Sequence, residues 1–158
     1  MRLRFALALL AIAAAAMPAT AQEVYTFLKQ ENWSAAGVTT DAEHFYFCAI
    51  KGTGHGGENV WLQDWRPDGR EVITVMLGDG HAPTAAVLDI DGFGYPLEHR
   101  DNGDFQTPEA TSTAIIDAME HGRKLTLQLE GAAAESFDYD LSGFAEARAA
   151  VAKSCIQS

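Results

Sequence analysis

Basic residues are scarce in this chain of 158 residues, which has 11 lysines and arginines against 22 aspartates and glutamates. The formal net charge at pH 7 is −11. Such a negative surface repels phosphate backbones and anionic lipid headgroups, so the composition argues against nucleic-acid binding. The acidic residues are spread over nearly every segment, which is typical of a surface adapted to solubility, and a cationic partner is the alternative interpretation.

Long apolar runs are also rare, and only the segment Phe5–Met17 forms one. It follows a start with two arginines and precedes a small-x-small pattern at Ala19 and Ala21, in the order typical of a secretory signal peptide. The run is shorter than the roughly 20 residues that a membrane-spanning helix needs. We therefore expect a signal peptide at 1–21 and a single extracytoplasmic domain at 22–158, periplasmic or secreted, with no integral membrane segment.

Cysteine is nearly absent, since Cys48 and Cys155 are the only two. They do not form a C-x-x-C motif, which argues against thiol exchange chemistry. In an oxidising compartment an even number of cysteines indicates pairing, and two cysteines allow only one connectivity. We expect a Cys48–Cys155 disulfide that closes a loop of about 107 residues and stabilises the fold by roughly 4–5 kcal/mol. Two free buried thiols are the alternative.

Short apolar runs predict six or seven β-strands. Those with clear boundaries are at 44–50, 60–65, 71–77, 85–90, 124–130 and 136–141. Residues 22–41 are mixed in character and show no clear period. Because strands and helices do not alternate along the chain, we expect an α+β fold with a mainly antiparallel β-sandwich or barrel-like sheet. One helix is inserted before the final hairpin and a second closes the chain.

Both helices have recognisable boundaries. The first is expected after a capping Thr107 and ends at Gly122. The second covers 143–154, and its apolar residues recur at spacings of three and four, so that they form one stripe. That stripe includes Cys155, which favours the disulfide independently. Its members are Phe144, Ala147, Val151 and Cys155.

Sequence motifs for catalysis and for metal or cofactor binding are missing. There is no G-x-S-x-G nucleophile motif and no H-E-x-x-H zinc motif. Residues 52–57 match G-x-G-x-x-G, but a strand follows instead of the helix that this phosphate site requires. Asp89 and Asp91 begin like a calcium loop, whereas Phe93 and Arg100 occupy two of its ligand positions. We therefore predict no catalytic, metal or cofactor site.

The candidate binding face is in the segment 60–65, where Trp61 and Trp65 lie four residues apart with Gln63 between them. In a strand these three residues project from the same face. Two aromatic rings beside an amide can form a platform for a ligand, and packing into the core is the alternative explanation. His55, in the adjoining glycine-rich loop, completes this candidate face.

The C-terminal third has a recognisable order: a helix ending in Ala118–Gly122, a strand, a short loop and then Phe137–Ala147. This order resembles the ending of the invasion-associated locus B family of small exported bacterial proteins, in which a helix, a basic-Gly pair, a strand and an L-x-G-F-x-x-A helix recur. Asn32-Trp33 and Asp89–Gly92 are compatible with it. The resemblance implies a periplasmic or secreted β-rich domain linked to envelope or host-surface interaction, and it carries over no catalytic residues.

These features predict a non-enzymatic binding or interaction module of the bacterial envelope, with a protein or an envelope component of unknown identity as its partner. Cleavage after residue 21 leaves 9 basic against 22 acidic residues, a net charge of −13. That charge favours a second hypothesis, an acidic inhibitor of a cationic secreted enzyme such as a lysozyme. A small hydrolase that uses scattered carboxylates or histidines is the third hypothesis.

Overall fold

The protein has an α+β fold, and the computed structural model describes residues 23–39, 45–53, 59–65, 69–78, 82–131 and 134–155. The expected signal peptide at 1–21 and the loop with His55 lie outside these ranges. The strands are β1 (Glu23–Lys29), β2 (Trp33–Thr39), β3 (Phe45–Thr53), β4 (Asn59–Trp65), β5 (Arg70–Met76), β6 (Ala85–Ile90), β7 (Phe93–Pro96), β8 (Glu98–His99), β9 (Phe105–Gln106), β10 (Lys124–Glu130) and β11 (Glu135–Asp140). The helices are α1 (Glu109–His121) and α2 (Phe144–Ser154).

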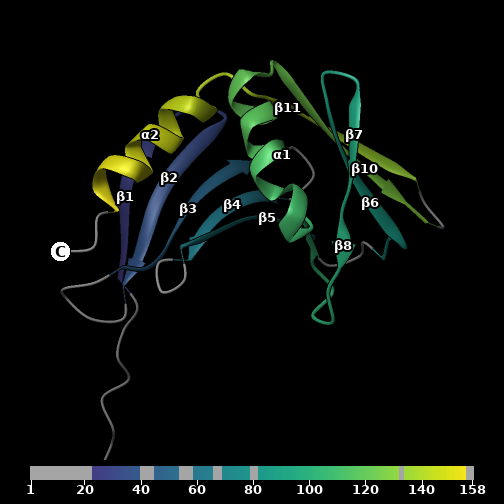
Figure 1. Ribbon diagram of the computed structural model, residues 1–158, viewed down its shortest axis with the longest axis horizontal. Coiled ribbons are helices and arrows are strands. Elements are labelled where there is room, and N and C mark those ends of the chain that lie inside the picture. The colour runs from purple at the N-terminus through teal and green to yellow at the C-terminus, as the bar shows by residue number, and fades with distance from the viewer. Residues whose placement is uncertain are drawn as a thin grey trace, which may run out of the picture.

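The strands form two antiparallel sheets (Figure 1). The larger sheet has seven strands in the order β1-β2-β3-β4-β5-β9-β8, and the smaller has four in the order β11-β10-β6-β7. Helix α1 precedes the β10–β11 hairpin, and α2 follows it. The prediction of an α+β sandwich with one inserted helix and one C-terminal helix is therefore confirmed.

Side chains alternate between the two faces of the seven-stranded sheet. On β2, Ala35 is buried whereas Ala36 is partly exposed. The strand register aligns Ala35 with three further buried residues, one from each of the next three strands. They are Ile50, Leu62 and Ile73. We call the side of the sheet that bears this row the inner face and the opposite side the outer face.

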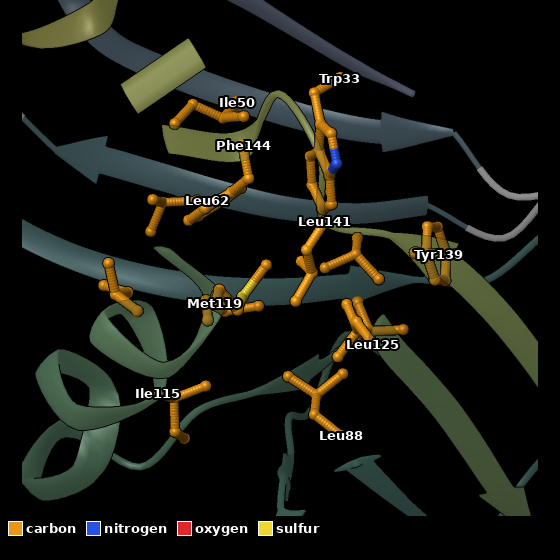
Figure 2. Close-up of a cluster of buried hydrophobic side chains, with 14 of the residues drawn as sticks. Trp33, Ile50, Leu62, Leu88, Ile115, Met119, Leu125, Tyr139, Leu141 and Phe144 are labelled. Atoms are coloured by element: carbon orange, nitrogen blue, oxygen red, sulfur yellow. The ribbon is translucent and has the colours of Figure 1, made fainter. Parts of the chain in front are cut away.

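The two helices cover the inner face, and Trp33 is one of its largest buried side chains. The Trp33 and Phe144 rings meet edge to face with their centroids 5.0 Å apart (Figure 2). The Trp33 Nε1–H donates to the carbonyl oxygen of Asp140 at 2.7 Å. Truncation of a buried tryptophan to alanine typically costs about 3–5 kcal/mol. Trp33 thus joins β2, the end of β11 and the start of α2.

The predicted disulfide between Cys48 of β3 and Cys155 after α2 is present. Both cysteines are buried and their Cα atoms are 6.4 Å apart. Phe144, Ala147 and Val151 of α2 are buried with them, as the spacing in the sequence predicted. The bond therefore attaches the end of α2 to the inner face.

The structure has more strands than the predicted six or seven, since it describes eleven. Two of them, β1 and β2, occupy 22–41, where the sequence shows no clear period. The inner face of β2 bears the small residues Ala35 and Gly37 beside Trp33, so the apolar signal of this strand is weak. The strands β7, β8 and β9 contain 4, 2 and 2 residues, which is too short for a period to be recognised.

The start of α1 also differs from the prediction, because Thr107 does not cap the helix. The helix begins at Glu109, Pro108 occupies the N-cap position, and no side chain caps it. The Thr107 Oγ1 instead accepts the Ile73 backbone N–H at 3.2 Å and donates to the Ser112 Oγ at 3.1 Å. These interior bonds satisfy a buried hydroxyl, so they determine where the side chain points.

A turn at Asp91-Gly92 joins β6 to β7. Both residues have positive φ angles, 50° and 94°, as a two-residue hairpin turn requires. The Asp89 Oδ1 accepts the Gly92 N–H at 2.9 Å. The Asp91 carboxylate accepts the backbone N–H groups of Arg123 at 3.0 Å and Lys124 at 3.1 Å. The two aspartates that begin like a calcium loop thus stabilise a turn and the start of β10.

Candidate functional site

The candidate binding residues of β4 lie on the outer face of the seven-stranded sheet. Leu62 is buried in the core, so the alternation of the strand places Trp61 and Gln63 on the opposite side. Both are partly exposed and neither belongs to the core cluster, so core packing does not explain Trp61. The Trp65 side chain and the whole of His55 lie outside the part of the chain that the structure describes.

Gln63 begins a hydrogen-bonded row of polar side chains across three strands. The Thr74 Oγ1 on β5 donates to the Gln63 Oε1 at 3.1 Å, and the Gln106 Nε2 on β9 donates to the Thr74 Oγ1 at 3.2 Å. Thr74 directly opposes Gln106 and is diagonal to Gln63, so the register brings the three together. Among the described residues, nothing pairs with the Gln63 amide N–H groups or the Gln106 amide oxygen. These atoms can therefore bond to a ligand.

Trp61 lies next to this row, between Lys51 and Thr74 on the neighbouring strands. The Lys51 Nζ is 5.1 Å from the centre of the indole, which is within the range of a cation–π contact. The Trp61 Nε1–H is covered, and no described residue accepts a hydrogen bond from it. A covered indole N–H usually has a partner. The Trp61 Nε1–H is therefore buried without a partner among the described residues, and only the exposed part of the indole is open to a ligand.

The charge of the outer face differs from that of the whole chain. Lys29, Lys51 and Arg70 lie on this face by the register of β1, β3 and β5. Among the described side chains of β1 to β5 on this face, none is a carboxylate. The first carboxylate on this side is Glu98 of the edge strand β8, and it pairs with Arg100 at 3.7 Å. The outer face is thus a basic surface on an acidic protein.

A hollow of about 360 Å³ continues the outer face towards the start of α1. Arg70, Arg100 and Gln106 contribute to its lining, together with the carboxylates of Glu98 and Glu109. The two arginines and two glutamates balance in charge. The hollow therefore adds polar surface to the face without changing its net charge.

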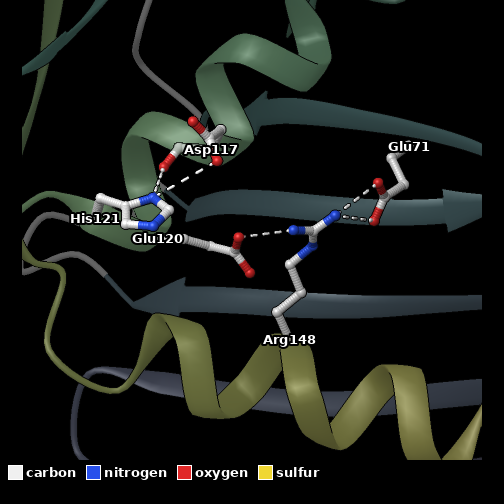
Figure 3. Close-up of polar contacts among 5 residues, drawn as sticks. All are labelled: Glu71, Asp117, Glu120, His121 and Arg148. Atoms are coloured by element: carbon white, nitrogen blue, oxygen red, sulfur yellow. Dashed lines mark hydrogen bonds and ion pairs between the residues drawn. The ribbon is translucent and has the colours of Figure 1, made fainter.

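A second polar cluster lies where α1, α2 and β5 meet on the inner side (Figure 3). The Arg148 Nη2 is 3.1 Å from the Glu71 Oε2, and its Nη1 is 2.9 Å from the Glu120 Oε2. The three side chains are between 25% and 33% exposed and line a groove of about 430 Å³. The groove is completed by Ala145, Ala149, Val151 and Ala152.

This cluster connects three elements of the fold. Desolvation lowers the pKa of Arg148, but the hydrogen bonds and charges of Glu120 and Glu71 raise it by more, so the guanidinium stays charged. Because one guanidinium pairs with both carboxylates, neither stands alone as a general acid or base. No pattern in the sequence predicted this cluster. The available signal was Glu71, an acidic residue beside the nearly continuous apolar run Val72–Val75.

The two described histidines lie apart from each other on the surface. The His121 Nδ1 is 2.9 Å from the carbonyl oxygen of Asp117, and this hydrogen bond raises the pKa of His121. The His99 ring packs on Phe105 with centroids 4.8 Å apart. Over the described ranges, no group of three or more histidine, cysteine, aspartate or glutamate side chains is arranged to hold a metal ion.

The buried disulfide is compatible with an exported protein. No helix in the described ranges has the length and apolar character needed to cross a membrane. No protein-family model, curated protein or solved structure matches this chain.

Proposed function

We propose that this protein is an exported, non-enzymatic binding module of the bacterial envelope, and that it binds its partner through the outer face of the seven-stranded sheet. The observation that carries this proposal is the partly exposed surface of Lys51, Trp61, Gln63 and Gln106, in which the buried Thr74 holds the two glutamines in place. None of these side chains belongs to the hydrophobic core cluster. The secretory signal pattern and the resemblance to small exported proteins support the same compartment.

The surface is held in place before any partner arrives. The hydrogen bonds of Thr74 to Gln63 and Gln106 restrict three side chains that would otherwise rotate. The Cys48–Cys155 disulfide holds α2 against the other side of the same sheet. Binding to a preorganised surface loses less conformational entropy, so a small patch can give useful affinity.

Cosedimentation of the purified protein with an isolated bacterial envelope fraction tests this proposal. The informative variants are Gln63→Ala and Lys51→Ala, and Gln128→Ala and Lys124→Ala are the matched controls on β10 of the other sheet. We expect the first two to reduce the bound fraction and the controls to bind like the unaltered protein. Circular dichroism and urea unfolding establish that each variant is folded. Equal binding by all four variants would refute the assignment of the outer face.

The second candidate function is inhibition of a cationic secreted enzyme, which the acidic surface of the four-stranded sheet favours. Asp89 and Asp138 lie on the side of that sheet opposite to its buried leucines, and Lys124 pairs with Asp138 at 2.9 Å. Electrostatic complementarity with a basic enzyme accelerates association and suppresses other partners. Lysis of bacterial cells by lysozyme in the presence of excess protein tests this function, and an unchanged rate argues against it.

A further inference from the structure

We infer that the outer face binds an acidic polysaccharide, a chain of hexopyranose units that carry carboxylate groups, laid across the strands of the seven-stranded sheet. This inference rests on the proposed function, because it names the ligand class of the same face. Three features of that face support it: the sign of its charge, the row of residues that crosses it, and the chemistry of those residues.

Charge complementarity selects an anionic ligand. Lys29 and Lys51 are on the outer face, whereas the chain as a whole has twice as many acidic as basic residues. A random distribution of side chains would bring carboxylates to this face as well, and the described residues of β1 to β5 bring none. Since the Debye length is about 8 Å at physiological salt, a ligand that lies flat on the face responds mainly to these nearby charges.

One row of residues crosses six strands without an aliphatic member. The register pairs each member with the next one, from β1 through β5 to β9. Neighbouring strands are about 4.8 Å apart, which is close to the length of one sugar unit in an extended chain. Successive sugars can therefore meet the partly exposed members of the row, whereas Thr74 is buried and holds the neighbouring glutamines in place. The members are Lys29, Ser34, Lys51, Trp61, Thr74 and Gln106.

The side chains in and beside this row match the groups of a sugar acid. An indole packs against the C–H face of a pyranose ring, and Trp61 is the aromatic member of the row. Lysine ammonium groups pair with carboxylates, and Lys51 directly adjoins Trp61. The Gln63 amide N–H groups and the Gln106 amide oxygen provide a donor and an acceptor for ring hydroxyls.

An anionic membrane fits these observations less well than a polysaccharide. A bilayer surface extends far beyond the basic face, so it also meets the acidic residues that dominate the rest of the protein. The amide groups of Gln63 and Gln106, which hydrogen bonds to Thr74 hold in place, give no advantage on a fluid layer of headgroups. A single extended chain avoids both difficulties, because it contacts the outer face alone.

Isothermal titration calorimetry of the full mature protein with oligogalacturonate tests the inference. A neutral maltooligosaccharide of the same length and vesicles of phosphatidylglycerol are the comparison ligands. The variants are Lys51→Gln on the outer face and Lys124→Gln as the control with the same change of charge. We expect binding to oligogalacturonate only, weakened on the order of tenfold by Lys51→Gln and by added salt, and unchanged in Lys124→Gln.

Other outcomes overturn the inference and separate it from the proposed function. Equal affinity for the neutral oligosaccharide, binding to the vesicles alone, equal loss in both variants, or no binding to any of the three ligands each refutes an acidic polysaccharide ligand. If the envelope fraction still requires Lys51 and Gln63 in the cosedimentation assay, the proposed function stands with another ligand. If that requirement is also absent, both fail.

Discussion

Reduction of the Cys48–Cys155 disulfide is expected to remove a large part of the stability of the fold. The two cysteines are separated by 107 positions, and the chain-entropy relation for a loop of that length gives about 4.8 kcal/mol at 25 °C. Single domains are typically stable by about 5–15 kcal/mol in total. The bond therefore accounts for a third or more of the free energy of unfolding, because it restricts the unfolded chain.

Urea unfolding followed by far-ultraviolet circular dichroism measures this effect, with and without a phosphine reductant. At a typical slope of about 2 kcal/mol per molar urea, the midpoint is expected to fall by about 2 M on reduction. Reduction leaves both sulfur atoms in place, so the packing around Cys48 and Cys155 changes little. The double variant Cys48→Ala/Cys155→Ala is the control, and its transition is expected not to respond to the reductant.

The burial of the bond leads to a second observable in the same experiment. Cys48 is 0% exposed and Cys155 is 1% exposed, so the reductant reaches the sulfur atoms only when the protein opens. Reduction is therefore expected to be slow in buffer and to accelerate in urea. A difference between the oxidised and reduced proteins of less than about 1 kcal/mol would refute the entropic reasoning. Rapid reduction in buffer would refute the burial of the bond.

Three further perturbations follow from single contacts. Gly52→Ala would place a methyl group 2.7 Å from a ring carbon of Trp33 and is expected to cost about 1–3 kcal/mol of unfolding free energy. In the control Gly94→Ala the nearest atom to the new methyl group is 3.4 Å away, and the unfolding free energy is expected to change by less than about 1 kcal/mol. Asp91→Ala removes the acceptor of two backbone N–H groups and is expected to cost about 2 kcal/mol in urea unfolding, and a neutral effect would contradict this role. The Ser142 backbone N–H donates to the Asp140 carboxylate and lowers its pKa below the ordinary value of 3.8. This carboxylate therefore contributes stability that is present above pH 3.8 and is lost as the pH falls through its native pKa. Asp140→Asn is expected to flatten the acid dependence of unfolding, and an unchanged dependence would refute that contribution.

Several parts of the structure could be read from the sequence, because they depend on local patterns. Leu125, Leu127 and Leu129 alternate with polar residues, which predicted the half-buried strand β10. The apolar stripe of α2 predicted both its covered side and the direction of Cys155. With only two cysteines in the chain, the pairing had one solution. The start of α1 was predicted wrongly, because a tertiary partner, Ile73, competes with the helix for the Thr107 hydroxyl.

The binding face illustrates the limit of local patterns. The alternation of β4 placed Trp61 and Gln63 together, but it did not say whether they face the core or the solvent. Only the pairing of β4 with its neighbours decided that Leu62 is on the inner face and Trp61 on the outer one. The short strands at the edges gave no periodic signal, so the row of residues across the sheet could not be seen beforehand.

The sequence by itself thus determined the elements whose period or composition is local: the strands β3 to β6, β10 and β11, the two helices and the single possible disulfide. The tertiary structure decided which distant residues meet. It brought Arg148 between Glu71 and Glu120, and it gathered cations from three strands on one face of an acidic protein. Strand order and register set these encounters, and both arise from the burial of the whole inner face rather than from any one segment.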